Sequence, residues 1–220
     1  KGEALLELGL YAESRRCFEK VLMEEPEHYL ANKFLLELDI REDLYEDAIN
    51  RCTNYINNYT CDNTQIGELK SVIGWTYLID LNMPEEAKKF FKESIAIYPA
   101  YSRAYTGLGI YEAHKKNYEE AINHFLKASE LSENDGENYF GLAICNKELK
   151  NYHLVEGYLM QANALEPEDN RVIEEYAFEL LRQERNEEAL EYLQEALDFN
   201  PENEDIRNLV LELKKNSRIN

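Results

Sequence analysis

Residues 102–135 read SRAYTGLGIYEAHKKNYEEAINHFLKASELSEND, and this stretch decides the fold. Small residues stand at Gly109 and, farther along, at Ala121 and Ala128, and one large aromatic side chain, Phe125, lies between the last two. Two antiparallel helices can approach to about 8 Å only where small side chains face each other. The stretch therefore predicts a helical hairpin in which Phe125 fills the space between the two helices.

The same pattern recurs along the whole chain. Equivalent places are held by Ser14, Ala48, Ala87, Ala121, Val155 and Ala189, separated by 34, 39, 34, 34 and 34 residues. The interval of 39 marks one insertion. Four of the six units end in a proline that stops the second helix, at Pro26, Pro99, Pro167 and Pro201. A period of about 34 residues is typical of helical repeat proteins.

The best-preserved unit reads Y-x-x-L-G from Tyr105 and A-x-x-x-F-x-x-A from Ala121, which resembles the signature W-x-x-L-G, A-x-x-x-F and P of the tetratricopeptide-repeat (TPR) family. The resemblance covers nearly the whole chain. It implies an all-α, right-handed superhelical solenoid of antiparallel helical hairpins, TPR-like, with about six repeats. We expect repeats near residues 1–28, 29–62, 67–101, 102–135, 136–169 and 170–203, and a C-terminal capping helix at 204–216.

The second repeat departs from the pattern. It carries Leu36 where Gly or Ala is usual, Cys52 in place of the aromatic residue, and Tyr55 in place of Ala. We therefore expect its packing to be looser or rotated.

The polar stretch 59–64 is expected to form a turn that holds the extra residues of the insertion. Residues 1–220 are predicted to form one solenoid domain. At 60–66 the domain either kinks or follows a longer loop with no change of path.

Several second helices have recognisable start signals. Asn117 stands as a capping residue before Glu119 and Glu120, whose charges complement the helix N-terminus. Pro84 is expected at the first position of another helix.

The charge balance bears on the partners. Lys and Arg number 24 and Asp and Glu number 44, so the net charge is −20. This charge would repel a phosphate backbone, and we expect no nucleic acid as a direct ligand. The acidic surface either keeps the protein soluble or selects a basic partner. No stretch approaches about 18 consecutive apolar residues, so we expect no membrane partner.

The four cysteines form no pair with zinc-ligand spacing, and we expect neither a metal nor a cofactor. Three of them stand in helical patterns and fit small buried apolar residues in a reducing compartment, which predicts a cytoplasmic protein. The histidines are scattered singly, and the acidic pairs stand at helix starts. Since no nucleophile with a base and no phosphate-binding loop is visible, we expect the chain not to be an enzyme.

The resemblance implies that the first helix of each repeat lines a concave groove. In the last three repeats the second, fifth, ninth, twelfth and thirteenth places then offer side chains to a partner. Apolar residues run along the middle of this predicted groove and charged residues along its edges, which suits an amphipathic helix or an extended peptide. The predicted groove residues are Arg103, Thr106, Ile110, Phe140, Ile144, Lys147, Arg171, Glu174, Phe178, Leu181 and Arg182.

Three hypotheses for the function follow. The first is an interaction scaffold that binds a peptide or helix of another protein in its concave groove. The second is a regulatory or substrate-docking arm of a larger enzyme, which the shortened first helix at residue 1 favours. The third is a self-assembling adaptor that associates weakly through this truncated N-terminal repeat.

Overall fold

The computed structural model describes residues 1–216, and every regular element in that range is a helix. By its internal contacts the chain divides into two compact units, Lys1–Tyr111 and Glu112–Asn220. No helix of the described range is both long enough and apolar enough to cross a lipid bilayer. The prediction of one domain with a kink at 60–66 stays a prediction.

The first unit contains α1 (Gly2–Glu7), α2 (Tyr11–Glu24), α3 (Tyr29–Arg41), α4 (Tyr45–Asn58), α5 (Asn63–Trp75), the π-helix η1 (Thr76–Asp80), α6 (Pro84–Ile97) and most of α7 (Ser102–His114). The second unit contains α8 (Tyr118–Leu131), α9 (Gly136–Glu148), α10 (Tyr152–Leu165), α11 (Asn170–Arg182), α12 (Asn186–Phe199) and α13 (Glu204–Asn216).

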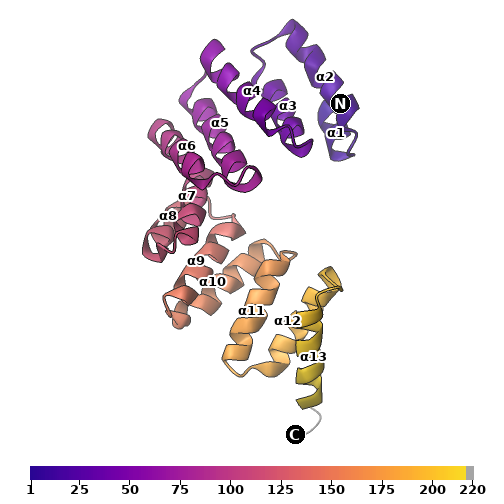
Figure 1. Cartoon of the computed structure of the whole chain (residues 1–220), viewed down its shortest axis with the longest axis vertical. Helices are drawn as coiled ribbons and strands as arrows, with labels where there is room; N and C mark the ends of the chain where they lie inside the picture. Colours follow the sequence, from indigo (N-terminus) through magenta and orange to yellow (C-terminus); the bar gives the residue numbers. More distant parts are fainter. Residues whose placement is uncertain (217–220) are drawn as a thin grey trace. The chain divides into compact units, whose positions relative to one another are not determined.

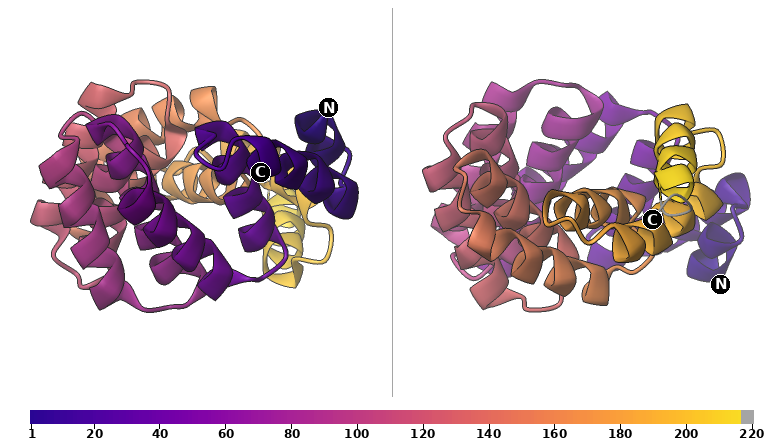
Figure 2. Two further views of the ribbon diagram at one scale, coloured as in Figure 1. Left: turned by 90° about the horizontal axis from the view of Figure 1, so that it is seen from above. Right: turned by 90° about the horizontal axis from the view of Figure 1, so that it is seen from below.

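Within each unit, helices that follow one another in the sequence pack side by side as hairpins (Figures 1 and 2). In the first unit α3 contacts both α2 and α4, and in the second unit α9 contacts both α8 and α10. The predicted all-α fold of antiparallel hairpins is confirmed. The helix predicted at 204–216 is α13, whose Ile206 and Val210 pack against Ala177 and Leu193.

The turn inside each hairpin repeats one backbone feature. It places a single residue in the left-handed region, with φ of 73° at Gly9, 60° at Asp43, 50° at Asn82, 62° at Lys116, 63° at Lys150 and 63° at Glu184. These residues are spaced by 34, 39, 34, 34 and 34, the same intervals as the small residues of the second helices. The repeat therefore appears in the backbone as well as in the side chains, although only one of the six turns uses a glycine.

Large aromatic residues fill the interfaces between helices, as predicted. A Cβ added at Gly74 would lie 2.7 Å from the ring of Phe91, and one at Gly107 would lie 2.3 Å from the same ring. A Cβ added at Gly141 would lie 2.5 Å from the ring of Phe125. Phe91 thus touches the first helix of its own repeat and that of the next, and glycine is required where each helix meets the ring.

The packing of the second repeat is not looser than that of its neighbours. Leu36, Cys52 and Tyr55 are all buried, and they form one cluster with Leu69 and Ile73 of the next repeat. A large residue on the first helix compensates for the small Cys52 on the second, so the interior stays filled.

The five extra residues do not form a polar loop. Only residues 59–62 separate α4 from α5, the same four-residue spacing that separates α2 from α3. Asp62 caps α5 by a capping box with Gln65, which starts the helix at this early point. The extra length lies in the first helical segment, which runs from Asn63 to Asp80 and ends in the π-helix.

Of the two predicted helix-start signals, Pro84 is as predicted and Asn117 is so only in part. Pro84 is the first residue of α6. Asn117 precedes α8, but its side chain makes no capping bond and instead donates a hydrogen bond of 2.7 Å to Glu112 Oε2. Its amide nitrogen thus donates to a charged acceptor, and its side-chain oxygen accepts no bond from the first N–H groups of α8.

A buried carboxylate joins three helices of the first unit. Asp39 of α3 is 1% exposed, and it accepts bonds of 2.7 Å from Arg15 of α2 and 2.7 Å from Arg51 of α4. Arg15 also binds Glu42. The charge of Asp39 is thus satisfied by partners on the helices either side of its own.

Candidate partner-binding pockets

One pocket lined by first helices lies in the first unit, and we call it the α3–α5 pocket. It has a volume of about 740 Å³. It is lined by Lys33, Leu36, Glu37, Ile40, Arg41, Val72, Trp75, Thr76, Ile79, Asp80, Tyr101 and Arg103. These residues come from α3, from α5 with its π-helix, and from the start of α7, so three consecutive first helices form the pocket.

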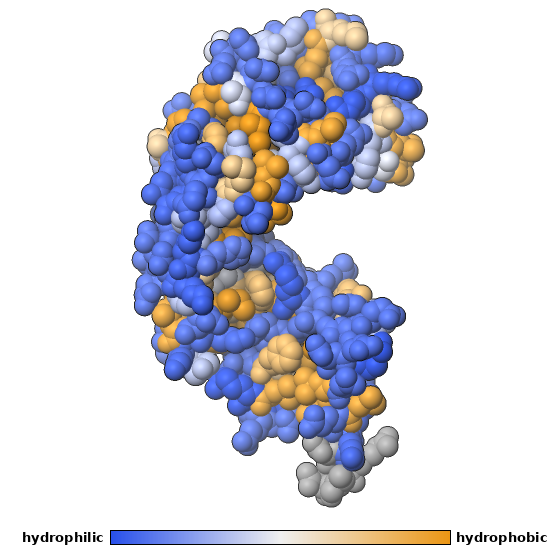
Figure 3. Space-filling model, viewed as in Figure 1, coloured by the Kyte–Doolittle hydropathy of each residue, from blue (hydrophilic) through white to orange (hydrophobic). Residues whose placement is uncertain are grey.

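The floor of the α3–α5 pocket is apolar. Trp75 is held in place by Phe91, with ring centroids 5.6 Å apart in an edge-on arrangement. Ile79, one turn farther along, is 62% exposed. Figure 3 shows apolar surface gathered over this part of α5 among hydrophilic surroundings. An apolar surface of this kind, rimmed by polar residues, is a feature of interaction sites.

Some of the charged residues that border the α3–α5 pocket form ion pairs within the chain, and others do not. Lys33 is paired with Glu68 at 3.1 Å, and Arg41 is paired with Glu37 at 2.7 Å. Arg103 lies over the ring of Trp75, with 5.5 Å from its guanidinium carbon to the ring centroid, and forms no ion pair with a described carboxylate.

Asp80 is the second pocket residue whose charge has no ion-pair partner among residues 1–216. Partial desolvation of its carboxyl group, together with the nearby Asp43 carboxylate, raises the pKa of Asp80 above its usual value. The pocket therefore offers one free cation and one free anion to a ligand.

The second pocket, which we call the α9–α11 pocket, lies in the second unit and has a volume of about 330 Å³. It is lined by Lys147, Glu148, Lys150, Tyr152, Glu175, Phe178, Glu179 and Arg182. Phe178 is 40% exposed and supplies the largest apolar surface. Lys147 is paired with Glu175, and the guanidinium of Arg182 lies 4.3 Å from the centroid of the Tyr152 ring.

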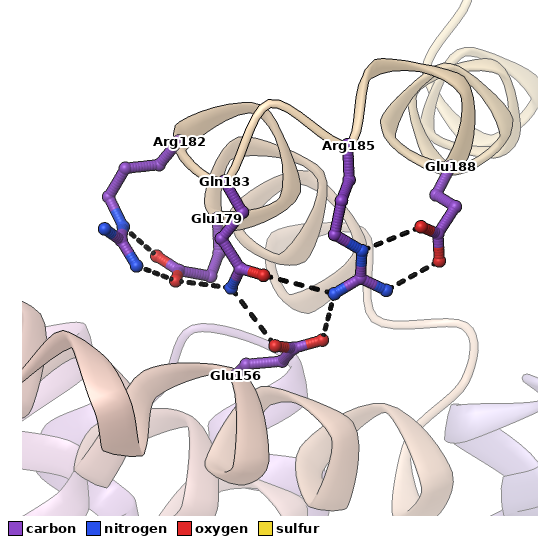
Figure 4. Close-up of polar contacts among 6 residues, drawn as sticks. All are labelled: Glu156, Glu179, Arg182, Gln183, Arg185 and Glu188. Atoms are coloured by element: carbon purple, nitrogen blue, oxygen red, sulfur yellow. Dashed lines mark hydrogen bonds and ion pairs between the residues drawn. The ribbon is translucent and has the colours of Figure 1, made fainter.

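A polar network holds the wall of the α9–α11 pocket (Figure 4). Glu179 accepts bonds of 2.5 and 2.8 Å from Arg182 and one of 2.9 Å from Gln183. Burial alone would raise the pKa of Glu179, but these hydrogen bonds outweigh it and lower the pKa below its usual value. Gln183 and Arg185 also donate to Glu156 of α10, at 3.1 and 2.5 Å, so the network ties two repeats together.

The structure brings only part of the predicted groove into these pockets. Lys147, Phe178 and Arg182 line the α9–α11 pocket, and Arg103 lines the α3–α5 pocket. Thr106 is buried, and its hydroxyl donates to the Ser102 carbonyl oxygen at 3.4 Å, so it offers nothing to a partner.

Other predicted groove residues pack on the chain itself. Ile110 lies against the cluster around Phe91, and Leu181 packs against two core clusters of the second unit. Phe140 packs beside Ala143 and is covered by Arg171, whose guanidinium carbon lies 5.2 Å from its ring centroid. Ile144 is partly buried.

Glu174 accepts hydrogen bonds of 2.6 Å from Asn170 and 3.2 Å from Asn203. Its carboxylate is thereby engaged at the junction of α11 with the start of α13. A role in binding for the eleven predicted residues stays a prediction.

The sequence reasoning missed most of the α3–α5 pocket because it began counting at the fourth repeat. The same places counted in the second and third repeats give ten residues, of which six line the pocket: Lys33, Glu37, Ile40, Arg41, Trp75 and Ile79. This recurrence was not recognised in the sequence because the second repeat is irregular and because the insertion was predicted in the stretch 59–64. In residues 1–216 no group of His, Cys, Asp and Glu side chains is arranged to hold a metal ion.

Two family models match parts of the chain. One model of the tetratricopeptide repeat matches residues 76–135, and another matches residues 1–28 and 175–203. With the hairpins, the turns and the 34-residue period already described, the chain belongs to the tetratricopeptide-repeat family. No curated protein sequence matches it significantly.

Solved structures with the same fold are numerous. The chain superposes on a chain of the APC/C hetero-tetramer Cut9–Hcn1 with a TM-score of 0.80 and 21% identity, covering 96% of this chain and 41% of that one. It superposes on PilF of Pseudomonas aeruginosa with a TM-score of 0.78 and 17% identity, covering 96% and 94%. A third similar structure is YrrB, a TPR protein with an unusual peptide-binding site, with a TM-score of 0.59, 21% identity and coverage of 90% and 97%. At these identities the likeness concerns the fold.

Proposed function

We propose that this protein binds a peptide or helix of a partner protein against the first helices of its repeats. A tetratricopeptide-repeat fold serves in general as a protein-interaction scaffold, and the proposal adds where the partner sits. The single observation that carries it is that the α3–α5 pocket and the α9–α11 pocket are each lined mainly by first helices of consecutive repeats. The small residues of the second helices lie in interfaces inside the solenoid. Second helices therefore contribute few residues to either of these two pockets.

The composition of the pockets supports a peptide as ligand. Exposed apolar side chains, Ile79 in one pocket and Phe178 in the other, stand beside charged groups on neighbouring helices. An amphipathic segment satisfies both kinds of surface at once, because it has apolar anchors on one side and polar groups on the other. Among the similar structures, YrrB is described as having a peptide-binding site.

A cytoplasmic location belongs to the same proposal. All four cysteines are free, and Cys52 and Cys145 are buried. Burial raises the pKa of Cys52 to about 12 and that of Cys145 to about 11, so both stay protonated as apolar core residues. Fractionation of the source cells tests this part: recovery of the protein mainly outside the cytoplasm would contradict it.

Affinity capture with surface variants tests the binding proposal. The variant Ile79→Asp, Phe178→Asp places charges in both pockets, and Met160→Asp is the matched control. Met160 is 54% exposed on the second helix α10 and lines neither pocket. We expect the control to capture the same partners as the wild type, and the pocket variant to lose them while keeping the far-ultraviolet circular dichroism of the folded protein. Equal capture by all three proteins would contradict the proposal.

A further inference from the structure

The α3–α5 pocket contains an arginine whose charge the protein leaves unused. Arg103 is exposed, lies over Trp75 and makes no ion pair with a described carboxylate. In this chain of net charge −20, six of the nine described arginines pair with carboxylates and Arg16, Arg103 and Arg207 do not. Among these three, Arg103 is the one that lies over an aromatic ring.

Arg171 shows what is missing around Arg103. The two arginines hold the same place two repeats apart, 68 residues from each other, and each lies over an aromatic ring of the preceding first helix. Arg171 combines this stacking with bonds of 2.7 Å to Glu137 and 2.7 Å to Asp169. Stacking on a ring engages the face of a guanidinium and leaves the N–H donors at its edge available.

Neither of the two carboxylates that pair with Arg171 has an equivalent that is available to Arg103. The residue corresponding to Asp169 is Tyr101, which carries no charge at neutral pH. An acid does precede Trp75, namely Glu68, but it is held by the Tyr29 hydroxyl at 2.8 Å and by Lys33 at 3.1 Å. Arg103 is thus oriented by Trp75 and lacks the acceptor that completes the equivalent site.

The helix that carries Trp75 has the rare π geometry at this point. The π-helix Thr76–Asp80 contains three residues of the pocket wall, Thr76, Ile79 and Asp80. In other repeats the first helix is a regular α-helix, so the wide turn is confined to the repeat with the larger pocket. Local π-helices occur preferentially at functional sites.

We propose that the α3–α5 pocket binds a peptide segment of a partner protein through one bulky apolar side chain against Trp75 and Ile79 and one Asp or Glu side chain that pairs with Arg103. This inference rests on the proposed function and specifies the chemistry of the ligand. The guanidinium donates two parallel hydrogen bonds to the ligand carboxylate, as arginine does to carboxylates in general.

The rest of the pocket limits the number of acids in the segment. Asp80 repels a second carboxylate at its own position, and the acidic chain as a whole disfavours a strongly acidic partner. The attraction of Arg103 acts at contact distance, whereas charges farther away than about 8–10 Å are screened at physiological salt. The segment therefore carries a single acid beside its apolar anchor, and a neutral or basic residue faces Asp80.

A peptide library displayed on phage and selected on the whole immobilised chain tests the inference. We expect the enriched peptides to share a bulky apolar residue with one acidic residue close to it. Anisotropy titrations of a labelled enriched peptide then compare the wild type with R103Q and with R207Q as the matched control, because Arg207 is exposed on α13 and lines neither pocket. R103Q should weaken binding at least about tenfold, as expected for the loss of a charge-assisted pair, and R207Q by less than about twofold.

A thermodynamic cycle isolates the contact itself. Replacing the peptide acid by its amide should weaken binding to the wild type about tenfold and binding to R103Q by less than about twofold, because the pair is already lost in that variant. Equal losses in both proteins would overturn the inference. Unchanged thermal unfolding of R103Q shows that the variant is folded.

Failure of this inference is distinguishable from failure of the proposed function. If the library yields no peptide that binds the chain better than it binds the Ile79→Asp, Phe178→Asp variant, both fail. If the enriched peptides are lost with Phe178→Asp alone and retained with Ile79→Asp alone, binding lies in the α9–α11 pocket. In that case the proposed function stands and the assignment of the acidic ligand to Arg103 is wrong.

Discussion

The second and third repeats fill the space between their helices in opposite ways. In the second repeat the first helix carries the large residue, Leu36, and the second helix carries the small one, Cys52. In the third repeat Gly74 stands on the first helix and Phe91 on the second. Both interfaces are closed, since Cys52 is 1% exposed and Phe91 is fully buried. In both repeats the space between the two helices is filled, although the large side chain comes from the first helix in one repeat and from the second helix in the other.

The largest expected effect is the loss of the phenyl ring. Phe91→Ala should lower the stability by about 3–5 kcal/mol, because it opens a cavity between α5, α6 and α7. Cys52→Ala removes one sulfur atom and should cost about 1 kcal/mol. Urea unfolding followed by circular dichroism measures both. A Cys52→Ala variant less stable than Phe91→Ala would show that the second repeat does not rely on Leu36 for its filling.

A double-mutant cycle tests the same comparison by giving the second repeat the arrangement of the third, with a small residue on the first helix and a phenyl ring on the second. Cys52→Phe alone should cost about 1–3 kcal/mol through overpacking, and Leu36→Ala alone about 2–5 kcal/mol through a cavity. Together they should cost about 1–3 kcal/mol less than their sum, because the new ring occupies the space that leucine vacates. Strict additivity in urea unfolding would mean that the two side chains do not share this space.

The second repeat differs from the third also in its buried charge. Asp39→Asn removes the anion that Arg15 and Arg51 share, and we expect a loss of about 2–3 kcal/mol, in the range for hydrogen bonds to charged groups. Arg41→Gln is the control, because its pair with Glu37 is exposed and should contribute less than about 0.5 kcal/mol. If the two variants unfold at the same temperature, Asp39 does not link the three helices as its contacts indicate.

A second buried carboxylate gives a pH-dependent comparison. Glu179 is 3% exposed, and the hydrogen bonds from Arg182 and Gln183 outweigh its burial and lower its pKa. Between the lowered folded pKa and the ordinary unfolded value the unfolded chain binds more protons, so the folded state loses stability as the pH falls through this range. Above the unfolded pKa the contribution is complete.

Glu179→Gln removes this titrating group. Urea midpoints measured from pH 7 down to pH 3 should therefore fall less steeply in the variant than in the wild type. Glu184→Gln, an exposed change two residues beyond Arg182, is the control and should leave the slope unchanged. Parallel profiles for the wild type and Glu179→Gln would exclude Glu179 as a source of the acid sensitivity.

The sequence predicted the hairpins because their determinants are local and periodic. Phe125, Ala121 and Ala128 recur with the period of the fold, and the structure buries all three. The insertion was misplaced because a polar stretch such as 59–64 favours a turn, whereas the capping box of Asp62 and Gln65 starts a helix within it. The groove stays a prediction: a place in the motif gives the face of a helix but not how deeply a side chain is buried, and Thr106 and Leu181 pack against the chain itself.

The smallest expected effect concerns the turns, which are alike in backbone and different in sequence. Gly9 and Lys116 occupy the same left-handed conformation, with φ of 73° and 62°. No atom lies within 4 Å of a Cβ placed on Gly9, so Gly9→Ala should cost about 1 kcal/mol from backbone strain alone. Lys116→Gly relieves the same strain and should stabilise the second unit, by less than about 1 kcal/mol because glycine also gains entropy in the unfolded chain. Opposite shifts of the melting temperature are the expected result; shifts of the same sign would mean that the turns differ in more than their side chains.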